Sequence, residues 1–263
     1  MISQDITGHH VYFRDTWHLF SLTLWVVPMV VIAVLIIARP EHRSVTPVYH
    51  QAVDRWWARQ PIYKGPRGLN YLPHFAAMFT PYHLVGNRLG DILWRYTAGA
   101  GLAAGLWLFC RVITHERPDR WRAFALTTLL ALPLSLPALQ NGQANAQFGG
   151  VLLLAAWCLH TRRWGTAVIC LWLAAGIKPL GLAAMGLAWA VYPQLRWCLA
   201  LGLPVFLAFP FAFGPPEYVF SQWVASWDNL RQCSAVSERR FADLNGVLRT
   251  FGIPLAGMAS LAV

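Results

Sequence analysis

The chain has 263 residues, of which 57% are hydrophobic and only 12% are charged. Soluble globular domains carry about 25% charged residues, so this composition excludes an ordinary soluble enzyme, a disordered chain and a fibrous protein. The net charge of +10 comes from 19 arginines and 2 lysines against 11 acidic residues. Because the arginines lie mostly between hydrophobic runs, we expect them to set membrane topology or to contact lipid phosphate, and we expect no nucleic-acid partner.

The hydrophobic runs predict an all-α fold, a polytopic bundle of about eight transmembrane helices. Arg39-Pro40-Glu41 offers no cleavage site, so the first run is a span and not a signal peptide. The last run stops at the chain end without a polar tail, and we expect residues 1–263 to be a single transmembrane domain cut from a longer protein. The predicted spans are Leu19–Ala38, Trp94–Ile113, Ala123–Leu139, Gln147–His160, Trp164–Ile177, Leu180–Tyr192, Trp197–Phe213 and Val247–Val263.

The orientation follows from the short loops, because positive charge collects in cytoplasmic loops. The segments 111–122, 161–163 and 193–196 are rich in arginine, whereas the loop 140–146 has no positive residue. We therefore expect a cytoplasmic N-terminus. The long loop 39–93 is then outside despite its own arginines, since long segments obey the rule weakly. This orientation gathers the unusual polar residues of the chain on the outer face.

The outer loop 39–93 is expected to lie at the membrane interface. Tyr49 to Trp57 has the spacing of an amphipathic surface helix, and Tyr71 to Val85 should be re-entrant or interfacial because Pro73 and Pro81 break it. The loop either seats the protein on lipid or binds lipid phosphate, for which guanidinium groups are suited. The candidate phosphate ligands are Arg43, Arg55, Arg59, His50 and His74.

Two later segments add polar groups to the same face. The segment 140–147 contains five carboxamides in eight residues, more than a helix-capping turn needs, and amides suit sugar hydroxyls. Lys178-Pro179 interrupts a hydrophobic stretch. A charge there marks either a functional site or a lysine that snorkels from the end of a short helix.

Known catalytic signatures are missing from the sequence. It contains no metalloprotease, hydrolase or nucleotide-binding motif, and its five cysteines lack metal-ligand spacing, so we expect no metal and no cofactor. Each outer-face acid, taken singly, is expected to be a solvated loop charge. These acids are Glu41, Asp54, Asp91, Glu217, Asp228, Glu238 and Asp243.

The order of these features resembles the membrane-embedded GT-C glycosyltransferases, specifically glycosyltransferase family 87, the polyprenol-phosphate-mannose-dependent mannosyltransferases. The resemblance covers roughly residues 20–190. Its motifs are Val48-Tyr49-x-x-Ala52, Trp57, Pro61-Ile62-Tyr63, Tyr71-Leu72-Pro73, Asn141-Gly142-Gln143-x-Asn145, Arg162-Arg163 and Lys178-Pro179.

The resemblance implies transfer of a sugar, expected to be mannose, from a polyprenol-phosphate donor to a saccharide or glycolipid hydroxyl. The reaction would take place on the periplasmic face of a bacterial inner membrane. In the family, an aspartate a few residues before the Val-Tyr pair is taken as the general base, but this chain has Ser44-Val45-Thr46-Pro47 there. A hydroxyl cannot accept the proton unaided at neutral pH. Either Asp54 or Glu41 substitutes, another loop supplies the acid, or the protein is catalytically altered.

We predict Asp54 as the base, with Glu41 as the alternative, and expect Arg43, Arg55 and Lys178 to stabilise the leaving phosphate. A rival interpretation is a non-catalytic transporter or assembly protein for lipid-linked saccharides, and the missing aspartate favours it. The ordered motifs favour the enzyme. The predicted substrate-binding residues are Arg43, Tyr49, His50, Arg55, Tyr71, His74, Asn141, Gln143, Asn145 and Lys178.

Overall fold

The computed structural model describes residues 6–39, 44–63, 69–114 and 117–235. Every regular element within these ranges is a helix, which confirms the predicted all-α fold. The helices are α1 (Ile6–Ala38), α2 (Thr46–Trp57), α3 (His74–Leu84), α4 (Asn87–Ile113), α5 (Arg117–Asn141), α6 (Asn145–His160), α7 (Trp164–Ile177), α8 (Gly181–Val191), α9 (Arg196–Ala208) and α10 (Pro216–Ala235), with short 3₁₀ turns η1 (Pro193–Leu195) and η2 (Phe209–Phe213).

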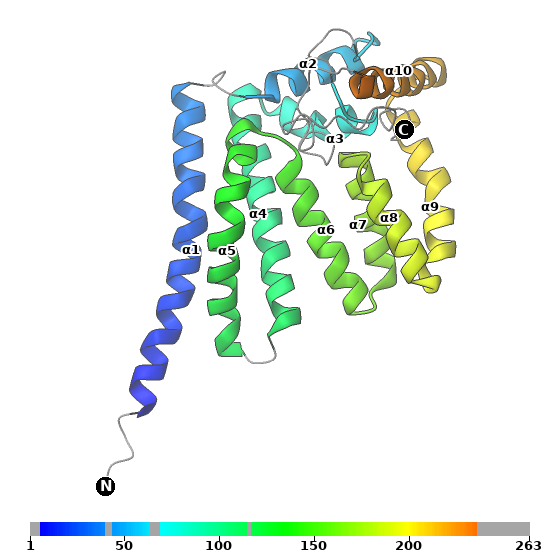
Figure 1. Cartoon of the computed structure of the whole chain (residues 1–263). Helices are drawn as coiled ribbons and strands as arrows, with labels where there is room; N and C mark the ends of the chain where they lie inside the picture. Colours follow the sequence, from blue (N-terminus) through cyan, green and yellow to red (C-terminus); the bar gives the residue numbers. More distant parts are fainter. Residues whose placement is uncertain (1–5, 40–43, 64–68, 115–116, 236–263) are drawn as a thin grey trace, which may run out of the picture.

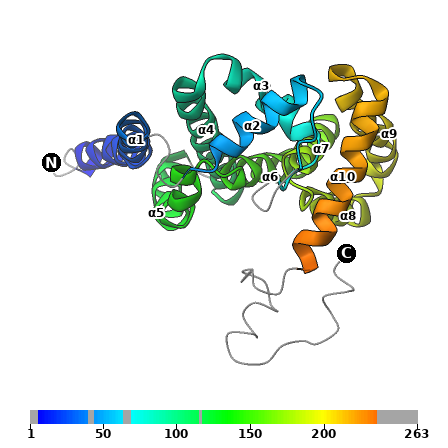
Figure 2. The same ribbon diagram turned by 90° about the horizontal axis from the view of Figure 1, so that it is seen from above.

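The helices form a bundle that is covered at one end. In Figure 1, α1 and α4 to α9 run side by side, whereas α2, α3 and α10 lie across one end of them. We call these three helices the outer layer. Seen from above, α2 and α3 lie beside the ends of α4, α6 and α7, and α10 crosses near α8 and α9 (Figure 2). The C-terminal ends of α4, α6 and α8 all lie at the opposite end (Figure 1).

Among the residues that the structure describes, four segments are long and apolar enough to cross a membrane: Thr16–Ala38, Asn87–Ile113, Asp119–Asn141 and Pro193–Phe213. The chain is thus a multi-pass membrane protein. The helices α7 and α8 are apolar but shorter, and the predicted span Val247–Val263 lies outside the described residues, so the expected count of eight is not reached. The short helices leave room for α3, whose His74 stacks on Phe206 of α9 with ring centroids 4.0 Å apart.

The outer loop contains the predicted amphipathic helix, because α2 covers Thr46–Trp57 and buries Trp56 while Trp57 stays 47% exposed. The prediction that Pro81 breaks the next segment is wrong, since α3 continues through Pro81 to Leu84. An internal proline removes a single backbone hydrogen bond. The burial of Phe75 and Phe79 on the same helix offsets that loss.

Candidate active site

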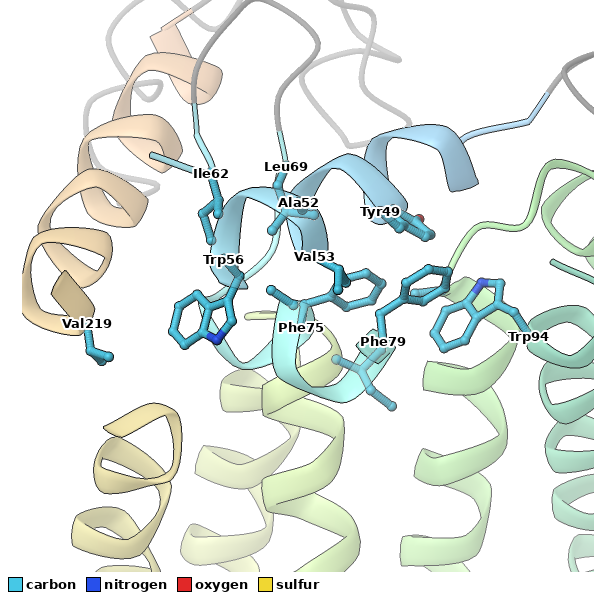
Figure 3. Close-up of a cluster of buried hydrophobic side chains, with 13 residues drawn as sticks. Tyr49, Ala52, Val53, Trp56, Ile62, Leu69, Phe75, Phe79, Trp94 and Val219 are labelled. Carbon is cyan, nitrogen blue, oxygen red and sulfur yellow. The ribbon is translucent and has the colours of Figure 1, made fainter. Parts of the chain in front are cut away.

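An aromatic cluster fixes the outer layer to the bundle. Trp56 and Phe79 are fully buried and Phe75 almost so, and Figure 3 shows their rings between α2 and the helix ends beneath it. The ring centroids of Tyr49 and Phe75 lie 4.7 Å apart, and those of Phe79 and Trp94 lie 5.1 Å apart, in edge-to-face geometry. Such aromatic pairs favour one fixed arrangement. The polar face of α2 is therefore held in a defined position.

Asp54 and His50 lie one turn apart on α2 and contact two neighbouring helices. His83, near the end of α3, places Nε2 3.2 Å from Asp54 Oδ1 and Nδ1 3.0 Å from His50 Nδ1. His50 Nε2 lies 3.0 Å from Asp91 Oδ1 on α4, and Arg95 follows one turn later on that helix. We call Asp54, His83, His50, Asp91 and Arg95 the histidine cluster.

The cluster leads from the surface into the protein. The side chain of Asp54 is 67% exposed, whereas those of Asp91 and Arg95 are 7% and 1% exposed. Asp91 is thus not the solvated loop charge that we expected. Arg95 donates hydrogen bonds to the carbonyl oxygens of Asp91 (3.0 Å) and Gln140 (3.2 Å) and to Ser44 Oγ (2.8 Å). These bonds compensate for burial of the guanidinium group. Ser44 stands where the resemblance expects an acid, and Arg95 holds it.

A second group lies at the ends of α6 and α7. Lys178 Nζ donates to Asn145 Oδ1, and Asn145 Nδ2 donates to Gln143 Oε1 at 2.9 Å. We call Gln143, Asn145 and Lys178 the amide cluster. Lys178 directly follows α7, and burial lowers the pKa of its ammonium group. Asn141, at the end of α5, accepts a hydrogen bond from the Val45 backbone through its carbonyl oxygen.

Two tyrosines connect α2 to the segment 140–147, which we call the amide loop. The hydroxyl oxygens of Tyr49 and Tyr71 lie 2.9 Å apart, and both hydroxyl groups interact with the backbone of Ala144, which lies between Gln143 and Asn145. Burial raises the pKa of both tyrosines, so both stay protonated at neutral pH. Tyr49 thus faces the amide loop, whereas its neighbour His50 faces α4.

The two clusters are separate hydrogen-bonded groups within the described part of the chain. Asp54 bonds to His83 on one side of α2, and Lys178 bonds to Asn145 on the side reached by Tyr49. The structure brings Tyr49, Tyr71, Gln143 and Asn145 together as predicted residues of one region. It brings Asp54 and His50 together in a second region, the histidine cluster.

The proposed phosphate ligands do not converge. His74 Nε2 donates to the Phe206 carbonyl at 2.7 Å, and burial lowers the pKa of His74 to about 4, so this ring is neutral at pH 7. Arg59 donates to the Phe213 carbonyl at 2.9 Å. His50 belongs to the histidine cluster, and Arg55 is partly buried on α2. Arg43 and the alternative base Glu41 lie outside the described residues.

Sequence reasoning missed three members of the histidine cluster: His83, Asp91 and Arg95. The signal for Arg95 was present, because it lies inside the predicted span Trp94–Ile113, where a charge marks function by default. Asp91 precedes it at helical i,i+4 spacing. No group of His, Cys, Asp or Glu suited to hold a metal ion occurs among the residues that the structure describes.

Comparison with known proteins places this architecture in a family. A family model described as glycosyltransferase family 87 matches residues 70–263, which is most of the chain. No curated protein and no solved structure gives a match. The match includes the amide cluster, His83, Asp91 and Arg95, and it begins after α2. The chain belongs to glycosyltransferase family 87 and is a membrane glycosyltransferase.

Proposed function

We propose that the protein is a GT-C type enzyme that moves mannose from a polyprenol-phosphate donor to a saccharide or glycolipid hydroxyl at the outer face of a bacterial inner membrane. The observation that carries the proposal is the geometry of Asp54. Its side chain is 67% exposed, and its Oδ1 is bound by His83. A carboxylate held at one oxygen can receive a substrate proton at the other.

The orientation is supported by the end of the bundle that lies opposite the outer layer (Figure 1). There Arg163 lies over the Trp157 ring at 4.7 Å and Arg196 over the Trp189 ring at 4.9 Å. Arginines and tryptophans together are typical of a membrane interface, and an excess of arginine is typical of the cytoplasmic side. Asp54 and the amide cluster then lie on the periplasmic side.

The lipid part of the donor fits an apolar cavity of about 400 Å³ between α3, α7 and α9. Its walls include Val168, Trp172, Gly176 and Phe206, with His74 at the outer layer. Branched hydrocarbon chains suit such a surface. Lys178 follows Gly176 by two residues, so a phosphate at the outer end of a bound isoprenoid would lie near its ammonium group. A lysine there stabilises the leaving phosphate as its charge develops.

In the reaction, the acceptor oxygen bonds to the anomeric carbon of the sugar, and the bond from that carbon to the phosphate oxygen breaks. The phosphate leaves with the bonding electrons, and the hydroxyl proton passes to Asp54. Because Asp54 and the amide cluster lie on different sides of α2, the acceptor must reach across that helix. The hydroxyls of Tyr49 and Tyr71 and the amides of Gln143 and Asn145 supply donors and acceptors for sugar hydroxyls. Asn141, two residues before Gln143 in the chain, is a further amide that we assign to sugar binding.

The test is reconstitution of the protein in proteoliposomes with polyprenol-phosphate-mannose and a panel of saccharide and glycolipid acceptors. Asp54→Asn should lower kcat/KM by about 10²- to 10⁴-fold, the usual contribution of general base catalysis. Asp228→Asn, at an exposed position on α10, is the matched control and should leave kcat/KM unchanged. Full activity of Asp54→Asn together with loss in Glu41→Gln would move the base to Glu41. Transfer that needs no lipid-phosphate donor would refute the proposal.

A further inference from the structure

Three close contacts join four titratable side chains in the histidine cluster. They are Asp54 Oδ1 to His83 Nε2 (3.2 Å), His83 Nδ1 to His50 Nδ1 (3.0 Å) and His50 Nε2 to Asp91 Oδ1 (3.0 Å). Both nitrogens of each imidazole are therefore used. Such a contact is favourable only when a proton lies between its two atoms.

The three contacts of the histidine cluster can hold either two protons or three. Two neutral imidazoles supply two N–H groups for three contacts, so one contact then joins two acceptors without a hydrogen. One further proton fills all three contacts. With Asp54, Asp91 and Arg95 ionised, the first state carries a net charge of −1 and the second is neutral. The two states differ by a single proton, which is the number that a glycosyl transfer releases from the acceptor hydroxyl.

At the buried end of the cluster, one proton is held between His50 Nε2 and Asp91 Oδ1. Asp91 is nearly buried, accepts from His50 Nε2, and has Arg95 Nη1 3.9 Å from its other oxygen. The two oxygens of Asp91 thus face His50 and the Arg95 guanidinium, and His50 Nδ1 is left to share a proton with His83. The other charged side chains on α2 and α4 near the cluster are Arg55 and Arg88; on α3, His74 is held by the Phe206 carbonyl at the far end of the helix.

We propose that His83 and His50 are positioning residues that make Asp54 part of one shared proton acceptor. This inference rests on the proposed function. When the acceptor hydroxyl oxygen bonds to the sugar, its proton passes to the free oxygen of Asp54, and rotation of this exposed carboxyl group brings the proton into the contact with His83 Nε2, so that all three contacts hold a proton. The proton is lost to water from the exposed Asp54 after the product leaves. A lone carboxylate titrates near pH 4 and an imidazole near pH 6.5, so the shared acceptor holds a proton better than an isolated carboxylate.

The first experiment needs no substrate. Protein labelled with ¹⁵N-histidine in detergent micelles is titrated by NMR, with ring signals assigned from single His→Gln variants. His50 and His83 should titrate as a coupled pair, as interacting sites do. Asp54→Asn should change the His83 curve, and His83→Gln should change the His50 curve. His160→Gln, at an exposed position at the other end of the bundle, should change neither. Independent curves for His50 and His83 would overturn the inference.

The second experiment is the pH profile of kcat/KM for mannose transfer. His83→Gln should lower kcat/KM at pH 7.5 by about 10- to 100-fold, part of the usual contribution of a general base. It should also move the acid limb to lower pH by about one unit or more, because a lone carboxylate then accepts the proton. A purely structural role would lower activity equally at every pH, and that result would overturn the inference.

The two experiments separate the inference from the proposed function. Coupled NMR curves without any lipid-dependent transfer would refute the proposed function and with it the role of the coupling. Uncoupled curves with full transfer would refute the inference alone. Asp54→Asn changes an exposed side chain, so it tests the coupling even if His83→Gln fails to fold.

Discussion

The contact between α4 and α6 depends on Gly150, and Gly150→Ala tests how closely these helices must approach. A Cβ atom at position 150 would lie 2.6 Å from the Gly101 carbonyl oxygen and 2.8 Å from the Leu102 nitrogen. Both are backbone atoms, which cannot rotate away. At Gly149 the same atom would meet only Leu102 Cδ1, at 3.8 Å. The two neighbouring glycines therefore form a matched pair.

The expected loss of stability in Gly150→Ala follows from these distances. Ordinary van der Waals contact begins near 3.4 Å, and the nearest atom to the added Cβ is the Gly101 carbonyl carbon at 2.5 Å. The helices α4 and α6 must therefore separate by roughly 0.6–0.9 Å, and a gap of about that size forfeits a quarter to a half of each dispersion contact. Small residues in membrane helices permit such close approach. We expect Gly150→Ala to lower the free energy of unfolding by about 1–3 kcal/mol, as overpacking does. Gly149→Ala should raise it by up to about 1 kcal/mol through helix propensity.

The assay is unfolding of the purified protein in mixed micelles with increasing SDS, followed by circular dichroism. From most to least stable, the order should be Gly149→Ala, wild type and Gly150→Ala. Gly101→Ala, where an added Cβ meets open space, should behave like Gly149→Ala. If Gly150→Ala proves as stable as Gly149→Ala, the close helix contact is wrong.

Three further predictions concern the outer layer. Burial lowers the pKa of His74 to about 4, below the unfolded value of about 6.5, so the unfolded state binds the proton first. The free energy of unfolding should therefore fall by roughly 3 kcal/mol as the pH drops from 6.5 to 4. His74→Phe should remove that pH dependence in the same SDS assay. Lys178→Met should lower kcat/KM for lipid-linked donors by about 10- to 100-fold through loss of charge stabilisation at the phosphate, whereas Arg163→Met at the other end of the bundle should leave it unchanged. Trp56→Ala should lower the free energy of unfolding by about 3–5 kcal/mol because Trp56 is fully buried. The control Trp57→Ala, which removes a half-exposed side chain, should lower it by less than about 1 kcal/mol.

The sequence predicted the helices well because hydrophobic runs are long-range signals of a membrane bundle. Leu19–Ala38 lies within α1, and the predicted run Trp164–Ile177 matches α7 exactly in its bounds. The predicted count of eight spans is not confirmed: four of the described segments are long and apolar enough to cross a membrane, and hydrophobicity does not show whether a shorter run crosses the membrane or ends below the outer layer. The contact of α3 with α9, for example, joins His74 and Phe206, which are far apart in the chain.

The amide loop was recognisable because its five carboxamides lie within eight consecutive residues. The histidine cluster was not, because its members come from three helices and, apart from Arg95 inside a predicted span, each looks ordinary alone. His83 ends an apolar helix, and Asp91 lies near the start of α4, where a solvated charge is common. Only packing of α2 against α3 and α4 turns these residues into a group, and the hydrophobic pattern does not encode which turn of one helix meets which turn of another.

In the proposed mechanism, the buried pair Asp91 and Arg95 accounts for a base at Asp54 in place of the aspartate that the family resemblance implies. Arg95 binds Ser44 before the start of α2, and Asp91 binds His50 in the middle of that helix. A carboxylate at position 44 would lie against the Arg95 guanidinium, which would hold it ionised and weaken it as a base. Asp54 lies two turns further along α2 and is bound by an imidazole, which can take up a proton where a guanidinium cannot. The same pair of residues therefore makes Ser44 a poor position for a base and Asp54 a good one.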